Sequence, residues 1–166
     1  MATPNPIHNI IFFISFIVVA VVTPRVNAQY ASQFMVPQNA ARARLRLRPL
    51  VWDKRLERYA MWWANHRRAD CELIHSNGPY GENLFWGSGT RWSPAQAAKG
   101  WLSEARNYKY FSNGCVGGQM CGHYTQIVWK ETRRIGCARV LCNGGGGVFM
   151  ICNYDPPGNF LGTRPY

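Results

Sequence analysis

The chain has 166 residues, of which 47% are hydrophobic and 14% aromatic, and its formal net charge is +11. This length suits a single domain with its own core, and the composition excludes a low-complexity disordered chain. The positive charge favours attraction to anionic surfaces such as acidic polysaccharide or phospholipid. No nucleic-acid-binding motif occurs, so we do not expect nucleic acid as a partner.

The first 28 residues predict a secretory signal peptide. The stretch from Ile10 to Val22 is apolar except for Ser15 and is too short to span a bilayer comfortably. The tripeptide Val26-Asn27-Ala28 ends in a small residue, as signal peptidase requires. The usual basic segment before the apolar stretch is missing, yet we prefer a signal peptide to a membrane anchor. Cleavage after Ala28 leaves residues 29–166 as one mature domain.

The first mature segment predicts a helix with an ambiguous start. Ser32 is a candidate cap, but Pro37 would then fall inside the helix. Either the helix begins at Pro37 or it kinks there. The segment Arg42–Arg48 follows, with arginine at every second position. It predicts a helix end that runs into an extended, solvated segment, and an anion-binding edge is the alternative.

Two clearer helices follow in the chain. Asp53 caps one that is expected to run to about Asp70, and Ser93 before Pro94 starts another. Helical spacing assigns these residues to the core: Leu56, Tyr59, Ala60, Trp63 and Ala64 in the first helix, and Ala97, Ala98, Trp101, Leu102 and Ala105 in the second. Glu104 is expected near the buried edge of the second helix.

The remaining segments predict a loop and two strands. A turn-rich loop between Leu73 and Trp86 brings His75 and Glu82 into the same neighbourhood. Residues 135–141 and 148–153 have the character of strands, and residues 143–147 join them as a hairpin loop. The four glycines of that loop do not indicate a phosphate site, because no helix and no lysine-serine pair follow them. No repeats and no second domain are indicated.

Six cysteines lie in the predicted mature part: Cys71, Cys115, Cys121, Cys137, Cys142 and Cys152. An even count in a secreted chain predicts three disulfides, and the absence of a CxxC pair disfavours a metal site made of cysteines. Six cysteines allow 15 pairings, and the residues alone do not choose among them.

Two stretches carry a family resemblance. Residues 122–132, GHYTQIVWKET, and residues 149–160, FMICNYDPPGNF, resemble the two signatures of the CAP superfamily. That superfamily comprises cysteine-rich secretory proteins, antigen 5 and the plant pathogenesis-related proteins of family 1. Residues 71–86 and the end GNFLGTRPY are similar to the plant members, and the likeness extends from about Asn39 to Tyr166. The chain looks like a basic member of plant family 1.

The resemblance implies an α+β fold. Its expected form is a three-layer α/β/α sandwich with a small antiparallel sheet, stapled by Cys71–Cys142, Cys115–Cys121 and Cys137–Cys152. It also implies a cleft lined by His75, Glu82, Glu104 and His123. Two imidazoles and two carboxylates suit zinc or another divalent cation completed by water. The alternative is a hydrogen-bonded polar network that braces the surrounding loops.

The resemblance further implies a sterol or other lipid as ligand. The expected site is the loop from Tyr108 to Gln119, through Tyr108, Tyr110 and Phe111, whose rings offer an apolar face. The alternative is that these rings pack into the core. The family's first helix usually carries a histidine where this chain has Gln38, and the segment LRLR also departs from the pattern. These departures bear on any transfer of activity from better-studied members.

The expected function is therefore a secreted antimicrobial defence protein, monomeric and extracellular in the apoplast rather than vacuolar. Anionic membrane or cell-wall surfaces are further expected partners. We do not expect an enzyme, because no serine or free cysteine pairs with the cleft residues. One alternative is a metal-dependent hydrolase acting through a metal-bound water. Another is a precursor that releases the segment Pro156–Tyr166 as an immune signalling peptide.

Overall fold

The computed structural model describes residues 24–166 of the chain. Its main elements are, in order, α1 (Pro24–Arg44), β1 (Val51–Trp52), α2 (Lys54–His66), β2 (Gly81–Gly87), α3 (Pro94–Ser103), β3 (Tyr108–Lys109), β4 (Gly114–Cys115), α4 (Gly122–Ile127), β5 (Arg134–Leu141) and β6 (Val148–Asp155). Short 3₁₀ turns, Glu104–Asn107 and Asn143–Gly145, follow α3 and join β5 to β6.

Four strands form the main sheet in the order β1-β5-β6-β2, which places β2 at one edge. The β5–β6 pair is antiparallel, as predicted, and these two strands coincide closely with the predicted ones. The β2–β6 pair is also antiparallel, but β2 corrects the prediction for residues 73–86, because residues 81–87 pair with β6 along their whole length and form a strand rather than part of a loop. The two-residue β1 pairs with β5 in parallel, so the sheet is mixed rather than purely antiparallel. The sequence did not indicate this strand. Strands β3 and β4 form a separate short hairpin.

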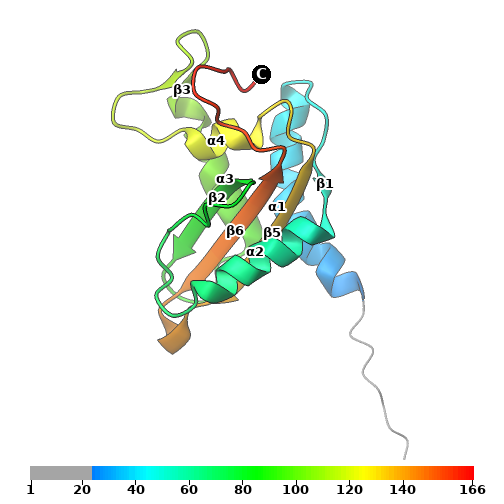
Figure 1. Cartoon of the computed structure of the whole chain (residues 1–166), viewed down its shortest axis with the longest axis vertical. Coiled ribbons are helices and arrows are strands. Elements are labelled where there is room, and N and C mark those ends of the chain that lie inside the picture. The colour runs from blue at the N-terminus through cyan, green and yellow to red at the C-terminus, as the bar shows by residue number, and fades with distance from the viewer. Residues whose placement is uncertain (1–23) are drawn as a thin grey trace, which may run out of the picture.

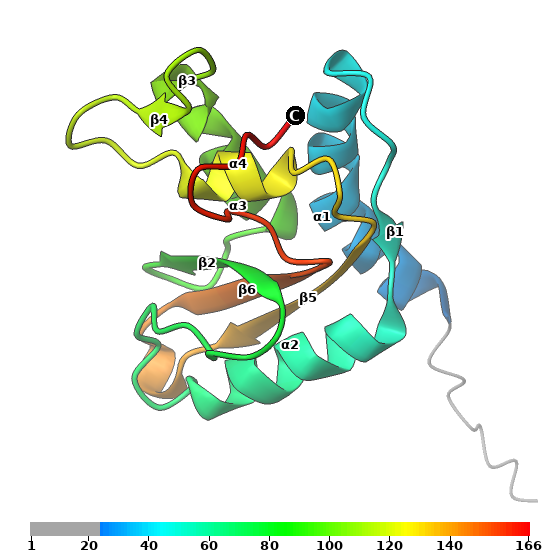
Figure 2. The ribbon, with the colours of Figure 1, turned by 45° about the horizontal axis from the view of Figure 1, so that its top comes forward.

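The expected three layers are present. Helix α2 covers one face of the sheet, and α1, α3 and α4 cover the other (Figures 1 and 2). Alternate residues of β6 supply the two cores, since successive strand side chains point to opposite faces. Val148, Met150, Cys152 and Tyr154 pack with α1, α3 and α4, whereas Phe149 and Ile151 pack with α2.

Helix α2 begins where the sequence predicts and ends earlier. The Asp53 carboxylate accepts hydrogen bonds from the backbone N–H groups of Arg55 and Leu56, and the helix ends at His66 rather than near Asp70. Residues 67–70 instead form a turn that leads to Cys71, which has a positive φ of 51°. Of the predicted core positions, Leu56, Ala60 and Ala64 are buried, and Tyr59 and Trp63 are half-buried.

Helix α3 starts with the predicted Ser93 cap, which forms a capping box with Gln96. Ala97, Ala98 and Trp101 are buried and Leu102 is half-buried, as expected. The prediction for Ala105 is wrong, because the chain changes to a tighter 3₁₀ turn after Ser103 and this residue becomes exposed.

Helix α1 corrects the predictions for the first segment. Ser32 is not the cap: it lies within the helix, where its hydroxyl donates to the carbonyl of Gln29. Pro37 also lies inside α1, so the helix does not begin there. Arg42 is fully buried rather than solvated. Arg44, Arg46 and Arg48 are exposed, and an anion-binding edge made of these three residues stays a prediction.

The guanidinium of Arg42 holds the turn between α4 and β5. It donates to the carbonyl oxygens of Ile127 (2.8 Å), Trp129 (2.8 Å) and Thr132 (3.0 Å), and also to that of Arg48 (2.7 Å). Burial lowers the pKa of Arg42 to about 10, which leaves the group charged at neutral pH. Arg42 therefore acts as an internal brace between α1 and the end of α4.

Three disulfides close the fold, Cys71–Cys142, Cys115–Cys121 and Cys137–Cys152, in the pairing that the resemblance implies. Such bonds persist in oxidising compartments. The predicted signal peptide lies largely outside the described residues, and the predicted cleavage point after Ala28 falls within α1. Among residues 24–166, no helix is both long and apolar enough to cross a membrane.

Candidate functional site

The four predicted cleft residues meet around the edge strand β2 as two pairs. Glu82 lies in β2 and faces the α2 side, where its Oε2 lies 3.0 Å from Nδ1 of His75. His123 lies in α4, on the other side of the sheet, and its Nδ1 lies 2.6 Å from Oε1 of Glu104. A cavity of about 330 Å³ is lined by His75, Glu82 and His123 together with Asn83 and Asn159.

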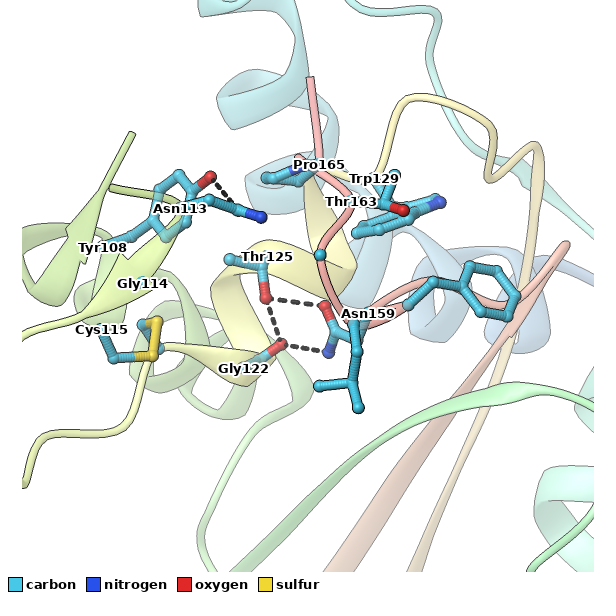
Figure 3. Close-up of a pocket in the computed structure, with 14 residues that line it drawn as sticks. Tyr108, Asn113, Gly114, Cys115, Gly122, Thr125, Trp129, Asn159, Thr163 and Pro165 are labelled. Carbon is cyan, nitrogen blue, oxygen red and sulfur yellow. Dashed lines mark hydrogen bonds between the residues drawn. A yellow bond between two sulfur atoms is a disulfide. The ribbon is translucent and has the colours of Figure 1, made fainter. Parts of the chain in front are cut away.

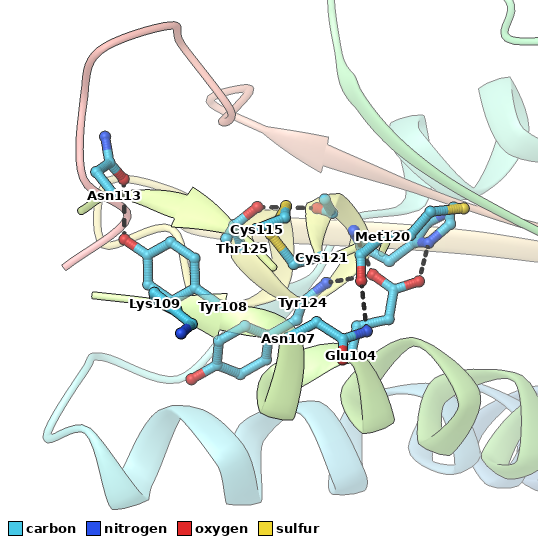
Figure 4. The surroundings of a disulfide bond; sticks show 12 residues. Glu104, Asn107, Tyr108, Lys109, Asn113, Cys115, Met120, Cys121, Tyr124 and Thr125 are labelled. Carbon is cyan, nitrogen blue, oxygen red and sulfur yellow. Dashed lines mark hydrogen bonds and ion pairs between the residues drawn. A yellow bond between two sulfur atoms is a disulfide. The ribbon is translucent and has the colours of Figure 1, made fainter. Parts of the chain in front are cut away.

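Both carboxylates are held by further protein donors. Glu104 accepts the backbone N–H of His123 at 3.0 Å at the start of α4, close to the Cys115–Cys121 bridge (Figure 4). Glu82 accepts the backbone N–H and the hydroxyl of Ser76, and the amide of Asn153 at 3.0 Å. Burial acts to raise the pKa of Glu82, but the hydrogen bonds from His75, Ser76 and Asn153 outweigh it and lower that pKa.

A buried chain of hydrogen bonds fixes the orientation of Asn83. The amide nitrogen of Gln38 donates to the carbonyl of Phe34, so the Gln38 oxygen accepts the Tyr154 hydroxyl at 2.8 Å. The Asn83 amide nitrogen then donates to the Tyr154 oxygen (3.2 Å) and to the carbonyl of His123 (3.0 Å). The Asn83 oxygen is left buried without a partner among the described residues.

Sequence reasoning missed Ser76, Asn83, Asn153 and Gln38 as members of this network. The premise that no serine pairs with the cleft residues is wrong, because the Ser76 hydroxyl donates to Glu82. The available signal was strand periodicity. Asn153 lies at the end of a predicted strand, and a buried amide there needs hydrogen-bonding partners, whereas Asn83 lies in the segment predicted as a loop. The partners of Gln38 were not accessible to that reasoning, because Tyr154 is 116 residues away.

The arrangement favours two imidazole ligands over a four-residue shell. Within the described chain, no three side chains of His, Cys, Asp or Glu gather closely enough to hold a metal ion. Each histidine instead uses Nδ1 for a carboxylate, and neither Nε2 has a partner among residues 24–166. Carboxylates commonly orient metal-binding imidazoles in this way, and imidazole suits zinc. Each imidazole therefore keeps one nitrogen without a partner among the described residues, and cation binding at this cleft stays a prediction.

The three predicted lipid-binding rings differ in exposure. Phe111 is 93% exposed at the tip of the β3–β4 hairpin, and Tyr110 is 41% exposed. Tyr110 stacks on Tyr166 with ring centroids 5.3 Å apart, beneath the guanidinium of Arg164. Tyr108 is half-buried, and its hydroxyl donates to Asn113 at 2.9 Å. Of the three rings, Phe111 is the one that does not pack as it would if these rings belonged to the core.

Two further cavities adjoin these elements. One of about 240 Å³ lies between the Cys115–Cys121 bridge, α4 and the C-terminal segment, with Tyr108, Trp129 and Phe160 in its wall (Figure 3). The other, of about 400 Å³, lies between α1 and α3. Its lining is mostly aliphatic and comprises Pro37, Ala40, Ala41, Arg44, Leu45, Leu102, Ala105 and Tyr124.

The C-terminal segment 156–166 is exposed in its middle and anchored at both ends. The Thr132 hydroxyl donates to the carbonyl of Pro156 at 2.9 Å, and the backbone N–H of Lys130 donates to that of Pro165 at 2.7 Å. Phe160 and Leu161, between these anchors, are exposed. The expectation of an exposed tail thus holds only for the middle of the segment.

Together, the three-layer sandwich, the paired His/Glu cleft and the three bridges define a CAP domain. A sequence profile of this family, the cysteine-rich secretory protein family, matches residues 37–154. The chain belongs to the CAP family and, within it, to the plant pathogenesis-related protein 1 group. It is accordingly a plant pathogenesis-related defence protein.

Individual relatives agree with this assignment. The chain is 61% identical over 137 residues to the pathogenesis-related protein PR-1 of Medicago truncatula, covering 82% of this chain and 79% of that protein. It is 50% identical over 152 residues to the basic form of pathogenesis-related protein 1 of Nicotiana tabacum, covering 91% and 84%. The crystal structure of NaASP2 with Zn²⁺ superposes with a TM-score of 0.68 at 26% identity, covering 83% and 85%.

Proposed function

We propose that this protein is secreted and acts in defence by binding a lipid, with sterols the expected class, rather than by catalysis. The observation that carries the proposal is Phe111, whose ring is 93% exposed on a short hairpin. A phenylalanine exposed to this degree offers apolar surface to a ligand. Withdrawal of sterol would harm a microbe that cannot make its own, which gives the binding an antimicrobial consequence.

The loop is also suited to bind at low entropic cost. The Cys115–Cys121 bridge closes its second half, and Arg164 donates to the backbone carbonyls of Tyr110 and Phe111 at 3.2 and 3.1 Å. A loop that is ordered before binding loses less conformational entropy when a ligand arrives. Tyr110 extends the apolar surface beside Phe111, since their ring centroids lie 6.0 Å apart.

The test is equilibrium binding of a fluorescent sterol to purified mature protein and to single variants. Phe111→Ser should weaken binding and leave thermal unfolding unchanged, because this ring packs little. Val51→Ser is the matched control, since Val51 is 63% exposed on β1. Ala105→Phe is designed to fill the cavity between α1 and α3. If Ala105→Phe is the one variant that loses sterol binding, or if Phe111→Ser binds sterol as tightly as the wild type, the proposed loop site is contradicted.

We further propose that His75 and His123 hold a divalent cation such as zinc in the cleft. The support is their unpartnered Nε2 atoms and the oriented imidazoles described above. When bound, zinc would supply Lewis acidity and a bound water, which is what the hydrolase alternative requires. The related NaASP2 structure, which contains Zn²⁺, adds support from a fold relative.

Calorimetric titration with zinc distinguishes this site from adventitious binding. His123→Gln should weaken zinc binding by about tenfold or more, because one of two imidazole ligands is lost. His66→Gln is the control, since this histidine is exposed on α2 and belongs to neither cleft pair. Equal titrations for the wild type and His123→Gln would refute the cation site. Ester or peptide turnover that both a chelator and His123→Gln abolish would favour the hydrolase instead.

Secretion and peptide release have direct tests of their own. Protein recovered from apoplastic fluid should begin at Gln29 if the predicted signal peptide is removed after Ala28. Mass spectrometry of the same fluid would detect segment 156–166 if the protein is a signalling precursor. We expect the intact domain to dominate, because both ends of that segment are held by hydrogen bonds to residues 130–132.

A further inference from the structure

The outer face of α2 carries aromatic and cationic side chains side by side. Leu56, Ala60 and Ala64 are buried against the sheet. The opposite side of the helix exposes Arg55, Arg58, Trp62 and His66, which follow one another at intervals of three and four residues, and the half-buried Tyr59 adjoins Trp62. The indole of Trp62 is 51% exposed. A purely solvated helix face carries charged and polar residues, so an aromatic row here indicates a ligand.

The rings of this face form one continuous row. Trp62 contacts Tyr59, Trp63 and His66, with centroids 5.3, 5.6 and 5.6 Å apart, and Tyr59 contacts Tyr80 at 5.1 Å. From Tyr59 to His66 the row extends about 10 Å along the helix axis, at 1.5 Å per residue. Such a row suits an extended, linear ligand better than a compact one.

The row is held rigid by polar contacts behind it. The Tyr59 hydroxyl lies 3.0 Å from the Ser76 hydroxyl, and the Trp63 indole N–H donates to the carbonyl of Ile74 at 2.9 Å. A Cβ atom at Gly78 would collide with the Tyr59 hydroxyl, so the absence of a side chain there lets the tyrosine take this position. Because the rings are already ordered, a ligand that stacks on them costs little additional entropy.

Charge on the same face selects an anionic ligand. The Arg55 side chain is 75% exposed and pairs with Asp53 at 3.5 Å, whereas Arg58 has no carboxylate partner within the described chain. Arg58 lies four residues before Trp62, and Arg55 four residues before Tyr59, a spacing that places the members of each pair on the same side of the helix. Guanidinium groups bind carboxylates through two parallel hydrogen bonds. The face therefore combines flat apolar surfaces with carboxylate-binding groups.

We propose that this face of α2 binds an acidic polysaccharide, a linear chain of uronic acid residues. The C–H faces of sugar rings stack on aromatic rings, and the uronate carboxylates would meet Arg55 and Arg58. Tyr59 and Trp63 are half-buried and lie against the domain, which suits support of a chain on the surface more than insertion into a bilayer. The surface is separate from the Phe111 loop, so the proposal does not depend on sterol binding.

The test uses mature protein and polygalacturonate, with dextran and phosphatidylserine vesicles as comparison ligands. Trp62→Ala and Arg58→Gln should each weaken polygalacturonate binding about tenfold, by analogy with the loss of one stacked ring or one charge-assisted contact. Matched controls are Trp86→Ala, at a tryptophan 45% exposed on β2, and Arg106→Gln, at an exposed arginine in the 3₁₀ turn after α3. These controls should stay within about twofold of the wild type.

Circular dichroism and unfolding midpoints establish that every variant is folded, which is expected for exposed positions. Binding to polygalacturonate that falls with salt and with both α2 variants, but with neither control, supports the proposal. Three results would overturn it. These are no binding by the wild type, equal losses in the α2 and control variants, and Trp62-dependent binding to vesicles but not to polygalacturonate.

Discussion

Replacement of Arg42 by methionine should destabilise the domain by about 3–5 kcal/mol, the range found when one partner of a buried charged interaction is removed. Arg42 has no exposed surface and donates to four backbone carbonyls. Each buried acceptor left unpaired costs about 1–3 kcal/mol, so the gross loss is roughly 4–12 kcal/mol. Removal of a buried charge returns several kcal/mol of desolvation, and this offset gives the smaller net value.

The measurement is urea unfolding at pH 7 with the disulfides intact. Arg44→Met is the matched control, since Arg44 lies two residues on in the same helix and is exposed. Its effect should stay within about 0.5 kcal/mol. The loss of unfolding free energy in Arg42→Lys should lie between those of the two methionine variants. An ammonium keeps the charge, but it lacks the planar guanidinium that donates to carbonyls on separate residues. If Arg42→Met and Arg44→Met agree within 1 kcal/mol, roughly the effect of an average substitution, the bracing role is refuted.

Three further predictions concern the cleft, the core and the C-terminal segment. Glu82→Gln should lower the unfolding free energy at pH 7 but less below about pH 4. The reason is that the lowered pKa of Glu82 gives stability that is present above its unfolded value and is lost on acidification; urea midpoints over a pH series test this sign. Gly136→Ala should lower the unfolding free energy by about 1–3 kcal/mol, because the new Cβ would collide with the backbone of Leu56 and Glu57 in α2. Gly100 has open space around it, so Gly100→Ala should be neutral or stabilising in the same melting assay. Deletion of residues 156–166 should lower the melting temperature, since Lys130 and Thr132 lose hydrogen-bond partners. An unchanged melting temperature would show that these two hydrogen bonds contribute nothing to stability.

Local patterns predicted the parts of the fold that local chemistry determines. Asp53 and Ser93 are polar caps directly before amphipathic helices, so both helix starts were recognisable. The two predicted strands and the glycine-rich turn between them likewise identified the hairpin of β5 and β6. The end of α2 was harder, because it is set by the turn that carries Cys71 to Cys142 rather than by a stop signal. The four cleft residues were found through the resemblance, not through spacing.

Long-range polar contacts were beyond sequence reasoning. Arg42 stands among four similar arginines, and nothing local separates it from the exposed three; its carbonyl partners in residues 127–132 lie 85–90 residues away. Asn83 and Gln38 likewise become part of the cleft network only through Tyr154. In each case the sequence shows a polar residue, but only the tertiary fold determines its hydrogen-bonding partner.

The anchoring of α1 has a consequence for the order of events during synthesis. This helix leaves the ribosome before every other described element. Three of the four carbonyls that accept from Arg42 nevertheless follow that residue by 85–90 residues, and the Tyr154 hydroxyl, which donates to Gln38, follows Gln38 by 116. At about 5–20 residues per second, the helix waits roughly 5–20 s for these partners. A nascent chain that lacks residues 127–154 cannot bury Arg42 with its hydrogen bonds made. The first helix to be translated is thus among the last to be locked in place, and completion of the domain is coupled to completion of the chain.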